Sequence, residues 1–292
     1  MRHPTFIFGL SVVILLSVFF SSISHIPFLM GKQFAQIIAS FVSISRGNTA
    51  DVERTIILRE TGAQTESSSG IFWLNSGGLF YVQNNTGETV QGDLPPYSYW
   101  RLTYAKSNSI DTDDGYHPQN ILRLITNAVA LNTTQTVYIK IIKDNYSQSP
   151  NRNSSNGIFL MSRYQNANNL YYAGMRVDGH AVIKRKSEGI YQTLGEVPLI
   201  TTDSAIYDRF KNPSLLPKDT WIGIKMETKN ISHDTLQITL FVDLNNTNSW
   251  EKVLELKDVA TQNQKPILSS GAGGIRSDFM DIKFKDYSME TL

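Results

Sequence analysis

The sequence predicts an all-β protein, an antiparallel β-sandwich of the jelly-roll kind preceded by an N-terminal hydrophobic helix. From about residue 50 onward, short runs of alternating apolar and polar residues are separated by Gly, Asn, Asp and Pro, as in strands joined by turns. Few of these segments have helical periodicity. With 41% hydrophobic residues among 292, the chain can build the core of one large β domain.

Residues 1–24 are typical of a signal peptide or membrane anchor. A basic start, "MRHPT", precedes the apolar run "FIFGLSVVILLSVFF", and "SSISH" offers a cleavage site after Ser24. The following stretch, "IPFLMGKQFAQIIASFVSIS", stays apolar, so an uncleaved anchor is the alternative. We therefore expect residues 25–51 to form a helical or linker segment and the protein to be secreted or anchored outside the cytoplasm.

Residues 52–292 are expected to form one jelly-roll domain, because neither a repeat nor a second zone of composition interrupts them. The expected strands, in chain order, are residues 70–76, 78–84, 98–106, 120–126, 136–144, 157–164, 170–177, 180–186, 190–197, 220–229, 236–244, 250–258 and 280–289. The long segments 147–157 and 198–219 are expected to be loops beside the ligand face.

The stretch "YYAGMRVDGHAVIKRK" predicts a β-hairpin, because Asp-Gly between alternating runs favours a two-residue turn. That turn places Val177 opposite His180 and Tyr172 opposite Arg185. One face, expected to be core, then carries Ala173, Met175, Val177 and Val182, with Lys184 at its end. The other face carries Tyr172, Arg176, Ile183 and Arg185.

Overall charge and composition exclude several classes of function. Twenty-seven basic and 26 acidic residues leave a net charge of +1, so no global field draws the protein to nucleic acid. Cysteine is absent, which removes disulfides and thiolate chemistry. Glycosylation sequons occur in polar stretches, which is compatible with export; they begin at Asn84, Asn132, Asn145, Asn153, Asn230 and Asn245.

Phrases between about residues 156 and 289 resemble the concanavalin A-like lectin/glucanase superfamily, especially laminin-G-like and polysaccharide-lyase-like jelly rolls. These phrases, in order, are "NGIFLMSRY", "NNLYYAGMRVDGHAVIKRKSEGIYQTL", "LPKDTWIGIKMETK", "LQITLFVD" and "GAGGIRSDFMDIKFKDYSM". The resemblance implies a protein that binds glycans, hydrolyses glycosidic bonds or cleaves uronic-acid polysaccharides by β-elimination. The fold alone does not choose between these activities.

Of these activities, glycan binding requires the fewest specific residues. It needs exposed aromatic rings with polar side chains beside them. The candidate ligand-binding residues are Tyr172, Arg176, Arg185, Trp100, Arg101 and Tyr104. The alternative for the hairpin is that Tyr172 and Arg185 only stack on each other across the strands. We expect a polysaccharide or glycoconjugate as the partner.

A polysaccharide lyase acting on a uronate glycan is the alternative function. It needs a group that neutralises a carboxylate and a Tyr or His that moves protons, and the candidates are His117, Arg123, Tyr172 and Arg176. In the alternative interpretation, His117 is an ordinary loop residue before a proline. Arg123 is then an arginine at a strand end that bonds a carbonyl or carboxylate group. The E-x-D-x-x-E motif of retaining glucanases is absent, so a lyase is favoured over a hydrolase if the chain is an enzyme.

The resemblance also implies a structural calcium ion, since jelly rolls of this kind often bind one through an aspartate of the last strand. Asp286 occupies the matching position, with Asp281 and Asp243 as further candidate ligands.

A third possible function is a structural or adhesive surface protein that packs one sandwich face on a protein partner. The sequence thus predicts an exported lectin-like domain, with these two alternatives.

Overall fold

The computed structural model describes residues 55–83, 86–200, 206–262 and 264–292. The predicted N-terminal hydrophobic helix and the linker before residue 52 lie outside the described residues, so the export and domain-boundary predictions stay predictions. Within the described ranges, no helix is both long and apolar enough to span a membrane.

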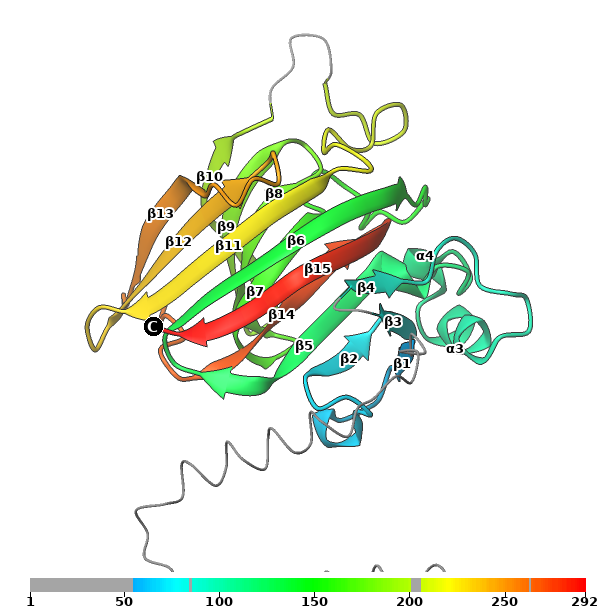
Figure 1. The fold of residues 1–292 in the computed structure, drawn as a ribbon, viewed down its shortest axis with the longest axis horizontal. Coiled ribbons are helices and arrows are strands. Elements are labelled where there is room, and N and C mark those ends of the chain that lie inside the picture. The colour runs from blue at the N-terminus through cyan, green and yellow to red at the C-terminus, as the bar shows by residue number, and fades with distance from the viewer. Residues whose placement is uncertain (1–54, 84–85, 201–205, 263) are drawn as a thin grey trace, which may run out of the picture. The chain divides into compact units, whose positions relative to one another are not determined.

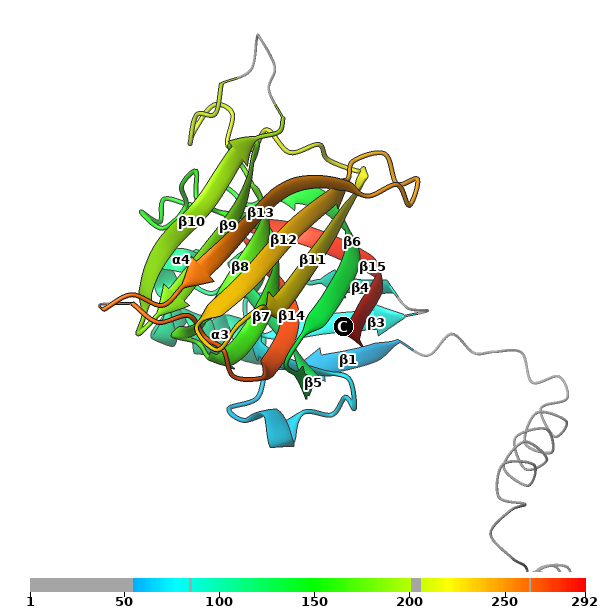
Figure 2. The ribbon, with the colours of Figure 1, turned by 90° about the vertical axis from the view of Figure 1, so that its left-hand side faces the viewer.

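Two antiparallel sheets lie face to face, which confirms the predicted β-sandwich (Figures 1 and 2). The eight-stranded sheet contains, in spatial order, β1 (Ile56–Arg59), β3 (Leu79–Gln83), β4 (Thr86–Thr89), β15 (Met280–Thr291), β6 (Thr133–Asp144), β11 (Trp221–Asn230), β12 (Thr235–Asp243) and β13 (Glu251–Val259). The seven-stranded sheet contains β10 (Ile190–Pro198), β9 (His180–Ser187), β8 (Asn169–Arg176), β7 (Gly157–Asn166), β14 (Gly271–Asp278), β5 (Ile121–Ala130) and β2 (Phe72–Ser76).

Alternation along each strand explains the core. On β7, Ile158 and Leu160 point between the sheets, whereas Phe159 and Met161 belong to a second apolar cluster. Successive side chains of a strand point to opposite faces, so this second cluster covers the outer face of the seven-stranded sheet. That sheet is consequently apolar on both faces, and its outer face offers a rigid hydrophobic floor.

The β8–β9 hairpin forms as predicted, but its register differs from the prediction by one residue. Tyr172 pairs with Lys184 and Tyr171 pairs with Arg185. The turn has three residues, with Gly179 at φ +85° and its N–H bonded to the Arg176 carbonyl. Ala173, Met175 and Val177 face the core as expected.

The one-residue difference exchanges the faces of β9. Val182 and Lys184 lie on the outer face, where core and strand-end positions had been expected. Ile183 and Arg185 point inward toward the other sheet. Lys184 and Arg185 therefore each lie on the face of the sheet opposite to the one predicted for them.

Residues 98–106 form a helix, so the strand predicted there is wrong. Helix α3 (Tyr99–Ser107) begins after Ser98, whose side chain accepts a hydrogen bond from the N–H of Arg101. Aromatic residues favour strands in general, but the N-cap serine determines the local structure here. The short helix α4 (Ser109–Thr112) follows, and both lie beyond β4 at the edge of the eight-stranded sheet (Figure 1). Two 3₁₀ turns complete the described helices, η2 (Gln64–Glu66) and η3 (Pro118–Asn120).

A buried ion pair joins the two sheets. Both oxygens of Asp258 on β13 accept hydrogen bonds from the Arg185 guanidinium, at 2.9 and 2.8 Å. The Tyr171 hydroxyl donates to the same carboxylate at 2.5 Å. All three residues are buried, and Asp258 is the carboxylate that balances the buried charge of Arg185.

We expect Asp258→Asn to lower the free energy of unfolding by about 3–5 kcal/mol, because it leaves the Arg185 charge buried without a counterion. Urea denaturation measures the change, with the exposed Glu251→Gln on the same strand as control. The double substitution Arg185→Met/Asp258→Leu should cost less than the sum of the two single substitutions. Additive costs would contradict a coupled ion pair.

Candidate functional site

A cleft of about 590 Å³ lies over the outer face of the seven-stranded sheet. Its floor comes from β5, β7, β8, β9, β10 and β14, and its rim comes from α4 and the segment before β7. The lining residues are Asp111, Ile121, Asn151, Asn153, Ser155, Asn156, Phe159, Tyr172, Lys184, Tyr191, Thr193, Arg276, Asp278 and Phe279. It is larger than a hollow of about 510 Å³ on the other sheet, which Tyr138 and Trp250 help to line.

Two tyrosines and an arginine form the centre of the cleft. The rings of Tyr172 and Tyr191 stack with centroids 6.0 Å apart and planes 25° from parallel. One nitrogen of Arg276 donates to both hydroxyl oxygens, each at 3.0 Å. Tyr172 is buried, whereas Tyr191 is 51% exposed and presents its ring to solvent.

Asp278 holds Arg276 in place. These residues are two apart on β14, so they share a face, and the Asp278 carboxylate accepts from Nε and from a terminal nitrogen of Arg276, both at 2.8 Å. Burial raises the pKa of Tyr172 to about 12 against the opposing charge of Arg276. Burial acts in the same direction on Tyr191, but the charge and hydrogen bond of Arg276, with Lys186, lower its pKa overall.

Lys184 is a buried cation in the wall of the cleft. Its side chain is buried, and Nζ donates to the Ser155 carbonyl at 2.7 Å and lies 4.9 Å from the centre of the Phe159 ring. Within the described ranges, no carboxylate forms an ion pair with it. Burial is the main cause that lowers the pKa of Lys184 from 10.5 to about 8.

The rim combines the Asp111 carboxylate with uncharged amide and hydroxyl groups. Asp111 accepts hydrogen bonds from the Ser149 hydroxyl at 2.5 Å and the Asn151 amide at 2.9 Å, which fixes the segment before β7 against α4. Asn153 is exposed on that segment, and its carbonyl oxygen accepts from the Ser155 N–H. Amide and hydroxyl groups of this kind suit a ligand with many hydroxyls.

Of the predicted ligand-binding residues on the hairpin, only Tyr172 lines the cleft. Arg176 lies on the outer face but is held by Asp178 and by Glu196, which accepts at 2.5 Å. Arg185 points between the sheets to Asp258, so neither ligand binding nor stacking on Tyr172 describes it. The alternation of β9 places Lys184 in the cleft instead.

The predicted ligand-binding residues Trp100, Arg101 and Tyr104 lie on helix α3 and not on a strand, and they do not line the cleft. Tyr104 is buried and donates to Glu60 at 2.5 Å. The guanidinium of Arg101 lies 3.8 Å from the centre of the Tyr116 ring, and Trp100 packs beside Pro118. These three candidate residues attach α3 to the sandwich and do not line the cleft.

The predicted catalytic residues do not form one group. His117 lies between Asp93 at 2.8 Å and Asp113 at 3.0 Å, away from the cleft lining. Arg123 pairs with Arg276 across β5 and β14 and hydrogen-bonds Tyr164. Of the four candidates for a lyase, only Tyr172 lines the cleft.

The predicted calcium ligands lie apart and are already bonded. The buried Asp281 accepts from Gln119, Asn145 and the Gly92 N–H at 2.9, 2.8 and 2.7 Å. Asp243 accepts from the Tyr138 hydroxyl and from loop N–H groups, while Asp286 is exposed on β15. Among the residues that the structure describes, no three His, Cys, Asp or Glu side chains gather to hold a metal ion. A structural calcium ion therefore stays a prediction.

Burial distinguishes the predicted sequons. Asn145 is buried with its amide bonded to Asp281, which leaves no room for a glycan at that nitrogen. Asn132 and Asn230 accept hydrogen bonds from the buried guanidinium of Arg163. Asn153 and Asn245 are exposed, and Asn84 lies outside the described residues.

Sequence reasoning missed Lys184, Tyr191, Arg276 and Asp278 as site residues. The signal for the last two is the R-x-D pattern in "GIRSD", which on a strand aims both side chains at one face. The expected strands did not include this segment, but Gly271–Asp278 forms β14.

Comparisons with known proteins show distant structural likeness. No protein-family model matches the chain, and no curated protein matches it. The carbohydrate-binding module CBM66 from Bacillus subtilis is 12% identical, covering 75% of this chain and 95% of that one, with a TM-score of 0.46. LamAcat from Zobellia galactanivorans is 12% identical, covering 80% and 93%, with a TM-score of 0.39. A native glycosidic hydrolase is 10% identical, covering 82% and 97%, with a TM-score of 0.40. At these identities and TM-scores, the likeness carries no argument about function, which has to come from the cleft.

We expect Lys184→Met to stabilise the protein at pH 7 by about 1 kcal/mol, because it removes a buried ammonium that has no counterion. The unfolded chain binds more protons than the folded chain between the lowered pKa of about 8 and the ordinary 10.5. The free energy of unfolding should therefore rise with pH across this window in the wild type and lose that component of the slope in Lys184→Met.

Urea denaturation from pH 7 to 10.5 measures both effects. The exposed Lys143→Met is the matched control and should leave stability within about 0.5 kcal/mol. A destabilised Lys184→Met protein at pH 7 would show that the lysine is a structural element of the fold.

Proposed function

We propose that the chain is a lectin-like carbohydrate-binding protein whose cleft holds a polysaccharide or glycoconjugate bearing anionic groups. The observation that carries the proposal is Lys184, a buried cation in the cleft wall without a carboxylate partner. A cation left in this state costs stability, and a bound anion would offset that cost.

The aromatic part of the cleft supports a sugar ring as the ligand. Tyr191 presents a half-exposed ring, and Tyr172 behind it fixes the orientation of that ring through their stacking. Sugar rings pack their C–H faces on such aromatic surfaces and hydrogen-bond through their edges. With its raised pKa, Tyr172 keeps its proton at neutral pH, so its hydroxyl remains a donor while its oxygen accepts from Arg276.

The charge around the cleft supports an acidic sugar over a neutral one. The lining balances Lys184 and Arg276 with Asp111 and Asp278, so the positive surplus comes from Lys186 beside it. Arg276 is matched by Asp278, whereas Lys184 has no ion-pair partner within the described chain. Lys186, with Nζ 4.6 Å from the centre of the Tyr191 ring, adds a further positive charge beside the two stacked tyrosines. A uronate carboxylate or a sulfate ester matches this surplus through charge-assisted hydrogen bonds.

Membership of the concanavalin A-like superfamily and export remain parts of the proposal. The phrases that carry the resemblance, between about residues 156 and 289, lie in β7 to β15, which belong to the two sheets of one sandwich. An exported protein with its N-terminus as a signal or anchor would meet extracellular polysaccharides, which suits a cleft for a large ligand.

A polysaccharide lyase is the second candidate, and one observation favours it. Tyr191, a residue type that can move protons, lies in the cleft beside Arg276 and Lys186, two cations that could neutralise a uronate. Burial acts to raise the pKa of Tyr191, but the charges of Arg276 and Lys186 lower it overall. If uronate polymers incubated with the protein gain the ultraviolet absorbance of an unsaturated product, the cleft is catalytic. An adhesive protein without glycan affinity is the third possibility.

We expect the full chain to bind uronate- or sulfate-bearing glycans on a glycan array, and Lys184→Gln to weaken that binding at least tenfold. The loss of a hydrogen bond to a charged group, about 1.5–3 kcal/mol, sets this magnitude. Lys143→Gln, which removes an exposed lysine, should bind as the wild type does.

Each array outcome has a distinct meaning. Acidic glycans binding to Lys184→Gln as tightly as to the wild type would contradict the role of charge. Binding of no glycan at all would contradict the proposed function and favour the adhesive alternative.

A further inference from the structure

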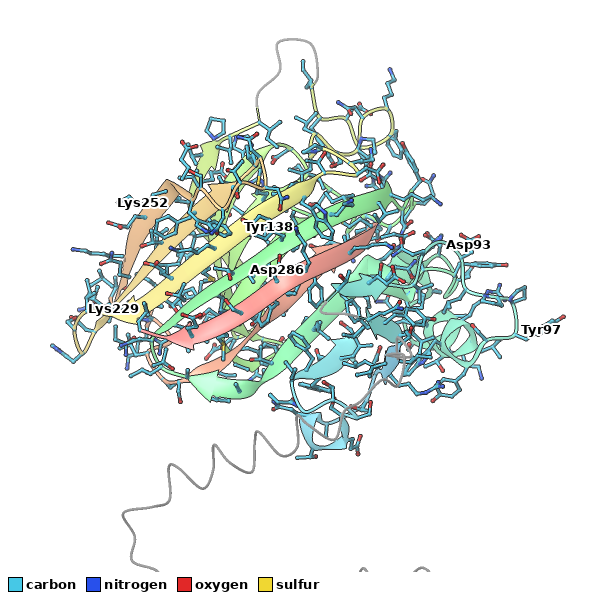
Figure 3. All side chains as sticks on the ribbon, viewed as in Figure 1. Asp93, Tyr97, Tyr138, Lys229, Lys252 and Asp286 are labelled. Atoms are coloured by element: carbon cyan, nitrogen blue, oxygen red, sulfur yellow. The ribbon has the colours of Figure 1, made fainter. Side chains whose placement is uncertain are left out.

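We propose a second, separate binding groove on the outer face of the eight-stranded sheet, for an uncharged sugar segment. The groove has a volume of about 510 Å³. Its lining includes Tyr138, Asn246, Asn248, Trp250, Lys285 and Asp286. Tyr138 and Asp286 come from the neighbouring strands β6 and β15 and lie near each other in the middle of the sheet (Figure 3).

The floor of the groove is a pair of aromatic rings packed across a glycine. Tyr138 and Trp250 have ring centroids 5.5 Å apart, with planes at 42°. Gly223 on β11 lies beneath them, and a Cβ there would come within 2.8 Å of the Tyr138 ring and 3.1 Å of the Trp250 ring. The glycine therefore leaves the space in which the two rings meet.

Both rings are held by hydrogen bonds beneath the groove. The Tyr138 hydroxyl donates to Asp243 at 2.8 Å, and the indole N–H of Trp250 donates to Asn248 at 3.0 Å. N–H groups of Thr247 and Asn248 donate to the same Asp243 carboxylate, at 2.9 and 2.7 Å. The aromatic platform is thus fixed before any ligand arrives, which lowers the entropy cost of binding.

Three residues around the groove adopt left-handed backbone conformations. Asn246, Asn248 and Asp286 have φ of 54°, 59° and 53°. Asp286 sits in the irregular segment of β15 between the pairings of Lys285 and Ser288, which lifts its carboxylate out of the regular ladder. Asn and Asp adopt this conformation more readily than other non-glycine residues, and here it shapes the turns that border the groove.

The two charged side chains of the groove form a pair, whereas Lys184 in the cleft forms no ion pair. Lys285 and Asp286 are its only charged lining residues within the described chain, and their side chains are 3.8 Å apart. The exposed Asp286 carboxylate and the Asn246 amide can share hydrogen bonds with neighbouring hydroxyls of a sugar, while Trp250 and Tyr138 pack on its ring. An uncharged saccharide fits this set better than an anion.

The groove and the cleft lie on opposite faces of the sandwich, so one domain could hold two glycan segments at once. Two sites that engage one polymer raise the overall affinity through effective concentration, without any new contact. The groove and the cleft share no lining residue, so binding in the groove does not depend on what the cleft binds.

Affinity gel electrophoresis of the full chain in gels containing β-glucan, xylan or mannan tests the groove. We expect at least one of these neutral polymers to retard the wild type, and Trp250→Ala and Asp286→Asn to weaken that retardation at least tenfold. Asn tolerates the left-handed backbone of Asp286, so the second variant removes charge without adding strain.

The matched controls are Lys229→Ala, at the exposed end of β11 (Figure 3), and Lys143→Ala, which removes another exposed lysine. Both should be retarded as the wild type is, whereas Tyr191→Ala distinguishes the cleft from the groove. The proposal is overturned if no neutral polymer retards the wild type, or if Trp250→Ala and Asp286→Asn migrate unchanged. Loss of retardation in Tyr191→Ala alone would place neutral sugars in the cleft and also overturn it.

Discussion

The register of the β8–β9 hairpin determines which basic side chains face the ligand and which hold the sandwich together. Gly179, at φ +85°, closes a three-residue turn that pairs Tyr172 with Lys184 and Tyr171 with Arg185. A shift by one residue would send every side chain of one strand to the opposite face. Arg185 would then lose Asp258, and the cleft would lose Lys184.

The same alternation lets one sheet perform two tasks. Its inner face joins the common core and places the polar group of Arg185, Asp258 and Tyr171 between the sheets. Its outer face carries a second apolar cluster, and the cleft lies over it. Because both faces of these strands are packed, the cleft side chains have fixed orientations, and binding requires little ordering of the protein. The opposite sheet repeats the arrangement on a smaller scale, with Tyr138 and Trp250 over Gly223.

Much of the fold follows from local pattern, whereas the site depends on details that pattern does not determine. Alternation located most strands and correctly assigned Ala173, Met175 and Val177 to the core. The register prediction was wrong because Asp-Gly favours two-residue turns, while here the glycine closes a turn of three. Tertiary packing decides between them.

The aromatic segment at residues 98–106 shows a different limit, because strand propensity outweighed the capping serine in the prediction, while the structure has a helix. Arg276 and Asp278 were missed because their importance comes from Tyr172 and Tyr191, which are distant in sequence and meet them only in the folded sheet. Lys184 was predicted at the end of the core face, where its charge is unfavourable. Once the register is known, the alternation of β9 places it in the cleft.

The central claim is that Lys184 is a cation kept without a partner until an acidic glycan supplies one. NMR titration of the lysine side-chain signals, assigned with Lys184→Met, measures its pKa directly with and without a uronate or sulfated oligosaccharide. The account predicts a pKa of about 8 in the free protein and a rise toward its ordinary value of 10.5 when the glycan binds. A pKa that stays unchanged at saturating glycan would contradict it.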